Sequence, residues 1–199
     1  MNPHPQANPA VHTIHHAFKL PLVGESAIAL DEFIPIFHGW IRNRALADEV
    51  MIDVADYAHV HGGPGVLLVC HEGHYVVDRS RNLLGLAYHR RRGQPLADGT
   101  ADATLALRRL IRAARLLADD PALAGRAVFD TTRLELRVLD RLRAPNDDAG
   151  WAAVQPSLRG AIAAVWGHEG ALERHVGDPR APLSAWARLP ATALAALHA

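Results

Sequence analysis

The alternation of three amphipathic stretches with groups of short β-type runs constrains the fold more than any other feature. Apolar residues recur at helical spacing in residues 31–41, 102–117 and 151–165. The runs rich in β-branched and aromatic residues are 12–23, 50–60, 66–78, 83–88, 127–130, 134–139, 171–176 and 183–188. Because strands joined by short turns pair antiparallel, we expect an α+β fold: a mainly antiparallel sheet with about three helices packed on one face.

The chain is long and apolar enough for a real core. Of its 199 residues, 49% are apolar and 21% are charged, which excludes a disordered protein. We expect a single domain over residues 11–190, or two closely packed halves, 11–100 and 101–190. The proline-rich residues 1–10 then form a flexible tail and residues 191–199 a C-terminal tail.

Charge and cysteine content exclude several classes of protein. Lys and Arg total 21, as do Asp and Glu, so the chain lacks the basic excess of a general nucleic-acid binder. A single cysteine, Cys70, rules out an intramolecular disulfide framework. No apolar run approaches the roughly 18 residues that cross a bilayer. We therefore expect a cytoplasmic protein with neither a membrane nor a nucleic-acid partner.

The sequence is rich in histidine, with 13 residues, and imidazole is the commonest metal ligand in proteins. Several histidines lie in residues 53–78, on either side of a glycine-rich turn at 61–65. A symmetric hairpin around this turn places Ala55 opposite His71 and Ile52 opposite His74. This register predicts one polar patch formed by Asp53, Tyr57, His59, His71 and Tyr75.

Such a patch has two chemical interpretations. His59, His71 and Asp53 could bind a divalent transition metal such as Zn, Fe or Mn, leaving a position for water. Without metal, His71 or His59 could act as a general acid or base oriented by Asp53, with Tyr57 or Tyr75 donating a hydrogen bond. The structural alternative is that these side chains only cap a half-exposed sheet and that the Asp bonds to a neighbouring backbone N–H.

Two further groups are weaker candidates for ligand binding. The backbone N–H groups at Gly63 and Gly65 could approach a phosphate, although a loop of this kind more often only closes a hairpin. Arg90 and Arg91 could hold an anionic group of a substrate, although such a run is more often a solvated loop.

Four segments of the first half carry a resemblance to other proteins: residues 33–41 (FIPIFHGWI), 52–60 (IDVADYAHV), 63–75 (GPGVLLVCHEGHY) and 85–92 (GLAYHRRR). Residues 140–146 (DRLRAPN) belong with them. Together they resemble a family of uncharacterised bacterial proteins. The resemblance implies no activity and assigns no residue a role.

Two hypotheses for function arise from these patterns. The first is a protein that binds a small molecule or a metal ion through the patch on the first hairpin, with a metal-dependent enzyme left open. The alternative is a non-catalytic protein–protein interaction or self-assembly module, which would use a sheet edge or the arginines of the helix at 102–117. A small-molecule ligand and a homo-oligomer are the partners that these hypotheses imply.

Overall fold

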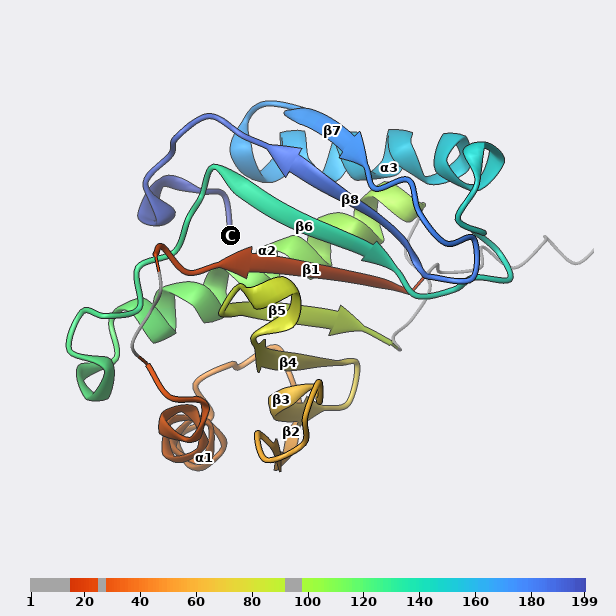
Figure 1. Cartoon of the computed structure of the whole chain (residues 1–199). Coiled ribbons are helices and arrows are strands. Elements are labelled where there is room, and N and C mark those ends of the chain that lie inside the picture. The colour runs from red at the N-terminus through yellow and green to blue at the C-terminus, as the bar shows by residue number, and fades with distance from the viewer. Residues whose placement is uncertain (1–14, 25–27, 92–97) are drawn as a thin grey trace, which may run out of the picture.

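A computed structural model describes residues 15–24, 28–91 and 98–199, and within them the fold is α+β, as predicted. One antiparallel sheet has the strand order β2-β3-β4-β5-β1-β6-β8-β7 (Figure 1). Its strands are β1 (His16–Pro21), β2 (Met51–Tyr57), β3 (Gly65–Cys70), β4 (Gly73–Asp78), β5 (Gly85–Arg90), β6 (Arg133–Val138), β7 (Ala171–Arg174) and β8 (Leu183–Arg188).

Three helices cover one face of this sheet, which we call the helix face. They are α1 (Phe33–Asn43), α2 (Gly99–Ala118) and α3 (Asp148–Trp166). In Figure 1, α2 runs behind the central strands and α3 lies beside β7 and β8, while α1 is at the opposite end near β2. Within the described residues, the open face carries short irregular segments, including the 3-10 turn η2 (Ser80–Asn82), and no helix of the length of α1–α3.

The helix ends agree with the sequence signals. Asp98 and Asp147 cap α2 and α3, since their carboxylates accept hydrogen bonds from Ala101 N (2.8 Å) and Gly150 N (2.7 Å). Gly167, with φ of 76°, ends α3 in the left-handed conformation that glycine adopts most easily. None of the helices in the described ranges combines the length and hydropathy that crossing a bilayer requires.

Strand alternation divides the side chains between the two faces. Phe18 of β1 pairs with Tyr88 and Leu136, and all three are buried on the helix face. The next residue, Lys19, pairs with Ala87 and Glu135 on the open face. Lys19 and Glu135 are nevertheless each only 2% exposed, so the open face is polar and partly closed.

The predicted register of the first hairpin was wrong. The run at 66–78 is two strands, because the chain turns back at His71 and Glu72, and β3 pairs with β4 as well as with β2. Ala55 lies opposite Leu67 instead of His71, because the turn between Tyr57 and Gly65 is centred two residues earlier than predicted, and a bulge separates Met51 from Asp53.

The remaining segments differ from the predicted elements in smaller ways. The run at 127–130 forms no strand, and Phe129 makes only an isolated bridge with Leu22. The C-terminal residues pack on α2, where the Arg115 guanidinium donates hydrogen bonds to the carbonyls of Leu194 and Ala195 (3.1 and 3.0 Å). The predicted tail at residues 1–10 lies outside the described residues.

Candidate functional site

The five residues of the predicted histidine patch do not converge. Tyr75 is 1% exposed and points to the helix face, where its ring packs on Tyr88 at 4.8 Å between centroids. Tyr57 and His59 are exposed at the end of β2, and His71 is in the β3–β4 turn. The patch fails because the extra turn inside residues 66–78 moves His71 off the strand and places Tyr75 on the opposite face from Asp53.

Asp53 has the structural role that the sequence left as its alternative. Its carboxylate accepts a hydrogen bond from the backbone N–H of Val54 (2.8 Å), and Asp56 does the same for Ala58 (2.8 Å). Both lie on β2, the outermost strand of the sheet, so acidic side chains cap N–H groups at this edge. Within the described residues, no group of three or more His, Cys, Asp or Glu side chains is arranged to hold a metal ion. His59, His71 and Asp53 therefore form no metal centre here.

The two glycines that were predicted to approach a phosphate have structural roles in the turn and the sheet. A Cβ at Gly65, whose φ is +72°, would lie 2.1 Å from the Val77 carbonyl oxygen, so this glycine permits close packing of β3 on β4. A Cβ at Gly63 would lie 2.8 Å from Val60 Cβ within the turn. Both glycines thus have a steric reason to be present.

Arg90 is the last residue of β5 and Arg91 follows it directly, so their side chains point to opposite faces of the sheet. Arg90 is 2% exposed and bound by carboxylates on the helix face, so it does not face a ligand as predicted. Arg91 Nη1 lies 2.9 Å from His74 Nε2, and with His71 these two side chains line a hollow of about 260 Å³. Of the predicted site residues, His71 and Arg91 are thus brought together.

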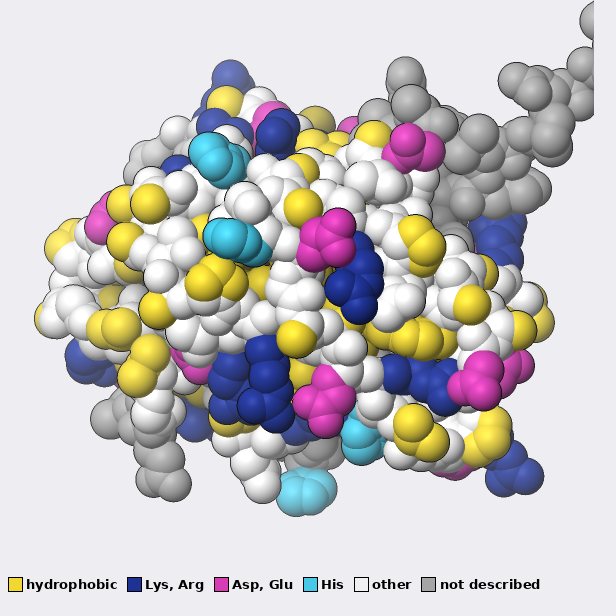
Figure 2. All heavy atoms as spheres, turned by 90° about the horizontal axis from the view of Figure 1, so that it is seen from above, with side chains coloured by type: hydrophobic (Ala, Val, Ile, Leu, Met, Phe, Trp, Pro, Cys, Tyr) yellow, Lys and Arg dark blue, Asp and Glu magenta, His cyan; other side chains and the backbone are white. Residues whose placement is uncertain are grey.

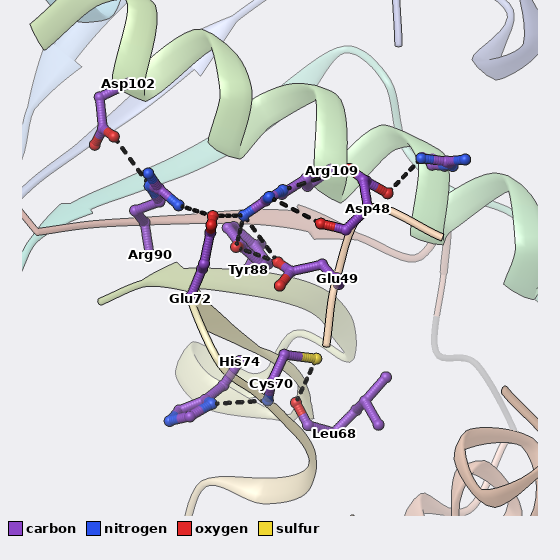
Figure 3. A network of polar contacts seen from close by, with 11 residues as sticks. Asp48, Glu49, Leu68, Cys70, Glu72, His74, Tyr88, Arg90, Asp102 and Arg109 are labelled. Atoms are coloured by element: carbon purple, nitrogen blue, oxygen red, sulfur yellow. Dashed lines mark hydrogen bonds and ion pairs between the residues drawn. The ribbon is translucent and has the colours of Figure 1, made fainter. Parts of the chain in front are cut away.

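A network of charged side chains lies on the helix face, between α2 and the sheet, buried at Arg90, Asp102, Arg109 and Glu49 and partly exposed at Glu72 and Asp48 (Figure 3). Glu72 Oε2 accepts hydrogen bonds from Arg90 Nη1 and Arg109 Nη1, both at 2.7 Å. Arg90 Nε reaches Asp102 Oδ1 at 3.0 Å on the first turn of α2. The network therefore joins β5, the β3–β4 turn and α2.

Arg109 is the centre of this helix-face network. Its Nη1 donates to Tyr88 Oη (2.8 Å) and lies 3.0 Å from Glu49 Oε1, while its Nη2 donates to the Asp48 carbonyl (3.2 Å). Tyr88 Oη in turn donates to Glu49 Oε1 at 2.5 Å. Both terminal nitrogens of this guanidinium are therefore used inside the protein, while its Nε makes no hydrogen bond among the described residues.

Carboxylates outnumber cations in the helix-face network. Arg90, Arg109 and Arg112 stand against Asp48, Glu49, Glu72 and Asp102, which is three cations and four carboxylates. Burial raises the pKa of Glu49 above its ordinary value. Burial pushes the pKa of Glu72 upward too, but Arg109 and Arg90 outweigh it and hold that pKa below the ordinary value. This region therefore already holds more carboxylates than guanidinium groups and does not suit an anionic ligand.

A second ionic network lies on the open face, where η2 folds over the sheet. Lys19 Nζ donates to Asp78 Oδ1, to Ser80 Oγ (3.0 Å) and to the Leu83 carbonyl (2.6 Å). A Cβ at Gly85 would lie 2.8 Å from Lys19 Cε, so this glycine leaves room for the lysine. The lysine and Asp78 thus neutralise each other beneath η2.

Arg81 and Arg137 share one buried carboxylate on this face. Their Nε atoms lie 3.0 and 3.3 Å from Glu135 Oε1. Arg81 Nη2 also donates to Ser184 Oγ (3.0 Å), and Arg137 Nη2 donates to Ser80 Oγ (3.1 Å). A guanidinium carries five N–H donors, and among the described residues each of these two arginines makes only one well-formed hydrogen bond. Donors therefore remain to bind an anion.

The backbone that presents Arg81 is strained. Arg81 and Asn82 both have left-handed backbone angles, with φ of 55° and 58°. This conformation is unfavourable for residues other than glycine and tends to persist where the surroundings enforce it. Here it directs the Arg81 guanidinium across β1 toward Ser184 of β8.

Three adjoining hollows form what we call the arginine groove, on the open face near β6 and β8. They measure about 350, 410 and 1090 Å³, with His175 shared by the first two and Arg133 by the last two. Six lining residues are cationic (Arg79, Arg81, Arg133, Arg137, Arg174 and Arg188) and three are acidic (Asp130, Glu173 and Asp178). Of these, Arg174 lies opposite Ala185 on the helix-face side of the sheet, and its Nη2 is 2.7 Å from Asp148 Oδ1 of α3, so its charge is already paired. Figure 2, which looks down on the β7 edge, shows basic side chains gathered beside acidic ones. The groove is therefore cationic although the chain as a whole has no net charge.

Sequence reasoning missed this groove. Arg133, Glu135 and Arg137 alternate with leucines and indicated only a strand with one polar face. Nothing in the spacing shows that η2, which comes before β5 in the chain, brings Arg81 to the same place. Residues that contact each other in this network are as many as 103 positions apart in the sequence. The one local signal is Lys19, the only lysine in the chain, in the middle of an apolar strand.

Comparison with known proteins adds no identity to this geometry. No protein-family model matches the chain, no curated protein matches it significantly, and no solved structure does. The resemblance to a bacterial family stays a prediction.

Proposed function

We propose that the protein binds a small anionic molecule in the arginine groove, with the guanidinium groups of Arg81 and Arg137 and the hydroxyl of Ser184 contacting its acidic group. The observation that carries this proposal is that Arg81 and Arg137 use only some of their N–H donors within the described part of the protein. Two guanidiniums are held 3.0 and 3.3 Å from one buried carboxylate, yet they retain unused N–H groups beside a hollow of about 350 Å³.

Carboxylate and phosphate are the groups that suit this site. Guanidinium is planar and donates in parallel, which matches the two oxygens of either group. Ser184 is 3% exposed and its hydroxyl already accepts from Arg81, so its own proton is free to be donated to an anion oxygen. Asp178 also lines this hollow, but its carboxylate accepts the backbone N–H of Arg180 (2.8 Å). The geometry supports binding and does not define a reaction.

Calorimetric titration with inorganic phosphate tests the proposal. Charge-assisted hydrogen bonds contribute roughly 1.5–3 kcal/mol, so Arg81→Gln and Arg137→Gln should each weaken phosphate binding by about tenfold or more. Arg42→Gln is the matched control, because Arg42 is an exposed arginine of α1 at the far end of the sheet. Equal affinity in all three variants would contradict the proposal.

A further inference from the structure

A second pair of arginines, Arg133 and Arg188, lies further along β6 and β8 than Arg81 and Arg137. The distance between the two pairs bears on the length of the ligand. In the register of β6 with β8, Arg137 lies opposite Ser184, Glu135 opposite Trp186, and Arg133 opposite Arg188. Trp186 therefore separates the Arg81–Arg137 pair from the Arg133–Arg188 pair. A second acid site at the Arg133–Arg188 pair would extend the proposed function and rests on it.

Arg133 and Arg188 are like charges in directly opposite cross-strand positions. Such pairs destabilise a sheet unless another charge balances them. Arg188 Nη2 lies 3.3 Å from Glu173 Oε2, at the outer strand β7. Arg133 has no ion pair among the described residues, and its guanidinium lies over the Trp186 ring, 4.8 Å from the centroid. Glu173 therefore balances only one of the two arginines at this end, whereas Glu135 contacts both Arg81 and Arg137 at the other end.

Trp186 provides a planar surface between the two pairs. Its half-buried ring lines the hollow of about 410 Å³ together with Arg133, Arg188 and His175. Indole is the best side chain for stacking on a planar group, and Arg133 already uses part of its face. A flat ligand ring would be held here by contacts that need no charge.

Spacing along β8 gives the length of the ligand. Ser184 and Arg188 are four residues apart on one strand, which is about 13 Å at roughly 3.3 Å per residue. We propose that the arginine groove takes an elongated ligand with an acidic group at each end and a planar ring between them. One acid would bind to Arg81 and Arg137, the ring would lie over Trp186, and the other acid would bind to Arg133 and Arg188.

A matched pair of probes tests this proposal: biphenyl with a carboxylate at each end, and biphenyl with a carboxylate at one end only. Calorimetry on the full chain should give an affinity for the dicarboxylate at least tenfold above that for the monocarboxylate, because only the former reaches both arginine pairs. In Arg133→Gln/Arg188→Gln this ratio should fall to about one. Trp186→Leu should weaken both probes roughly fivefold, and Trp186→Phe should restore most of that loss.

The outcomes separate this inference from the proposed function. If phosphate binds through Arg81 and Arg137 but the dicarboxylate is no better than the monocarboxylate, the elongated ligand is wrong and the single anion site stands. If neither phosphate nor either probe depends on Arg81 and Arg137, both proposals fail. Circular dichroism on each variant shows that it is folded, and a ratio unchanged by a folded Arg133→Gln/Arg188→Gln protein overturns the second subsite.

Discussion

The two faces of one sheet use the same chemistry, arginine with carboxylate, to different ends. On the helix face, Arg109 hydrogen-bonds to Glu72, Tyr88 and the Asp48 carbonyl and also contacts Glu49. On the open face, Arg81 and Arg137 share Glu135 and keep most of their donors. Arg109 uses both terminal nitrogens inside the protein and holds elements together, whereas Arg81 and Arg137 keep terminal N–H groups beside a hollow, where they can bind a ligand.

The largest expected difference between the faces is in stability. Arg109→Met leaves the fully buried Glu49 carboxylate without its cation, while Glu72 keeps Arg90, and should lower the free energy of unfolding by about 3–5 kcal/mol. Arg137→Met removes a partly exposed side chain from a carboxylate that keeps Arg81, and should lower it by only about 1 kcal/mol. Urea denaturation measures both changes. Equal losses would show that the open-face network is as structural as the other.

Each face also buries a histidine that responds to acid. Burial lowers the pKa of His16, on the helix face, and of His89, on the open face, from 6.5 to about 4. Between these values the unfolded chain binds more protons than the folded one, so the free energy of unfolding should decrease as the pH falls from 6.5 to 4. The expected decrease is on the order of 3 kcal/mol per histidine.

Replacing one histidine at a time shows which face of the sheet causes the pH dependence of the free energy of unfolding. His16→Gln and His89→Gln should each flatten the stability profile over that range, and the two effects should add because the side chains lie on opposite faces. Denaturation at a series of pH values measures the slope. A wild-type profile with no slope between pH 6.5 and 4 contradicts the burial of both imidazoles.

Removing an arginine from the groove should not destabilise the fold. Arg133→Gln removes the charge repulsion between Arg133 and Arg188, which lie opposite each other on β6 and β8. The free energy of unfolding should therefore stay level or rise by about 0.5 kcal/mol. Binding of the biphenyl dicarboxylate should weaken in the same variant. A loss of more than about 1 kcal/mol would place Arg133 among the structural arginines.

The smallest effect is expected at the β2 edge, which bears on the alternative of self-assembly. Asp53→Ala frees the Val54 N–H and removes a negative charge from an outermost strand that already exposes Ile52 and Tyr57. The variant should self-associate more than wild type, as measured by light scattering at increasing concentration. His59→Ala is the matched control on the same exposed segment, and equal behaviour of the two would show that Asp53 does not protect the edge.

The fold was more predictable from sequence than the site, because its signals are local. Helical spacing in residues 151–165 located α3, and the β-type run at 134–139 located β6. The turn at His71 and Glu72 could not be recognised because it interrupts an apolar run without the Asn-Gly or Asp-Gly pair that marks a tight hairpin. That missed turn removed His71 from the strand and put Tyr75 on the helix face. The β2–β3 turn is also centred two residues earlier than predicted, which changed the register, and together these differences dispersed the predicted patch.

The arginine groove could not be predicted because it depends on which face the helices cover. Alternation assigns Arg133 and Arg137 to the face opposite Leu134 and Leu136, but it does not reveal that this face stays open. Nor does it reveal that a strained turn carries Arg81 over the sheet. Both facts arise from contacts between residues far apart in the chain.

One measurement tests the central claim most directly: amide and guanidinium NMR signals followed during titration with inorganic phosphate. Binding in the arginine groove predicts saturable shifts at Arg81, Arg137 and Ser184, with the signals of Arg109 and Glu72 unchanged. Shifts centred on Arg109 and Glu72, or no saturable shift at Arg81 and Arg137, would contradict the division of the sheet into a structural face and a binding face.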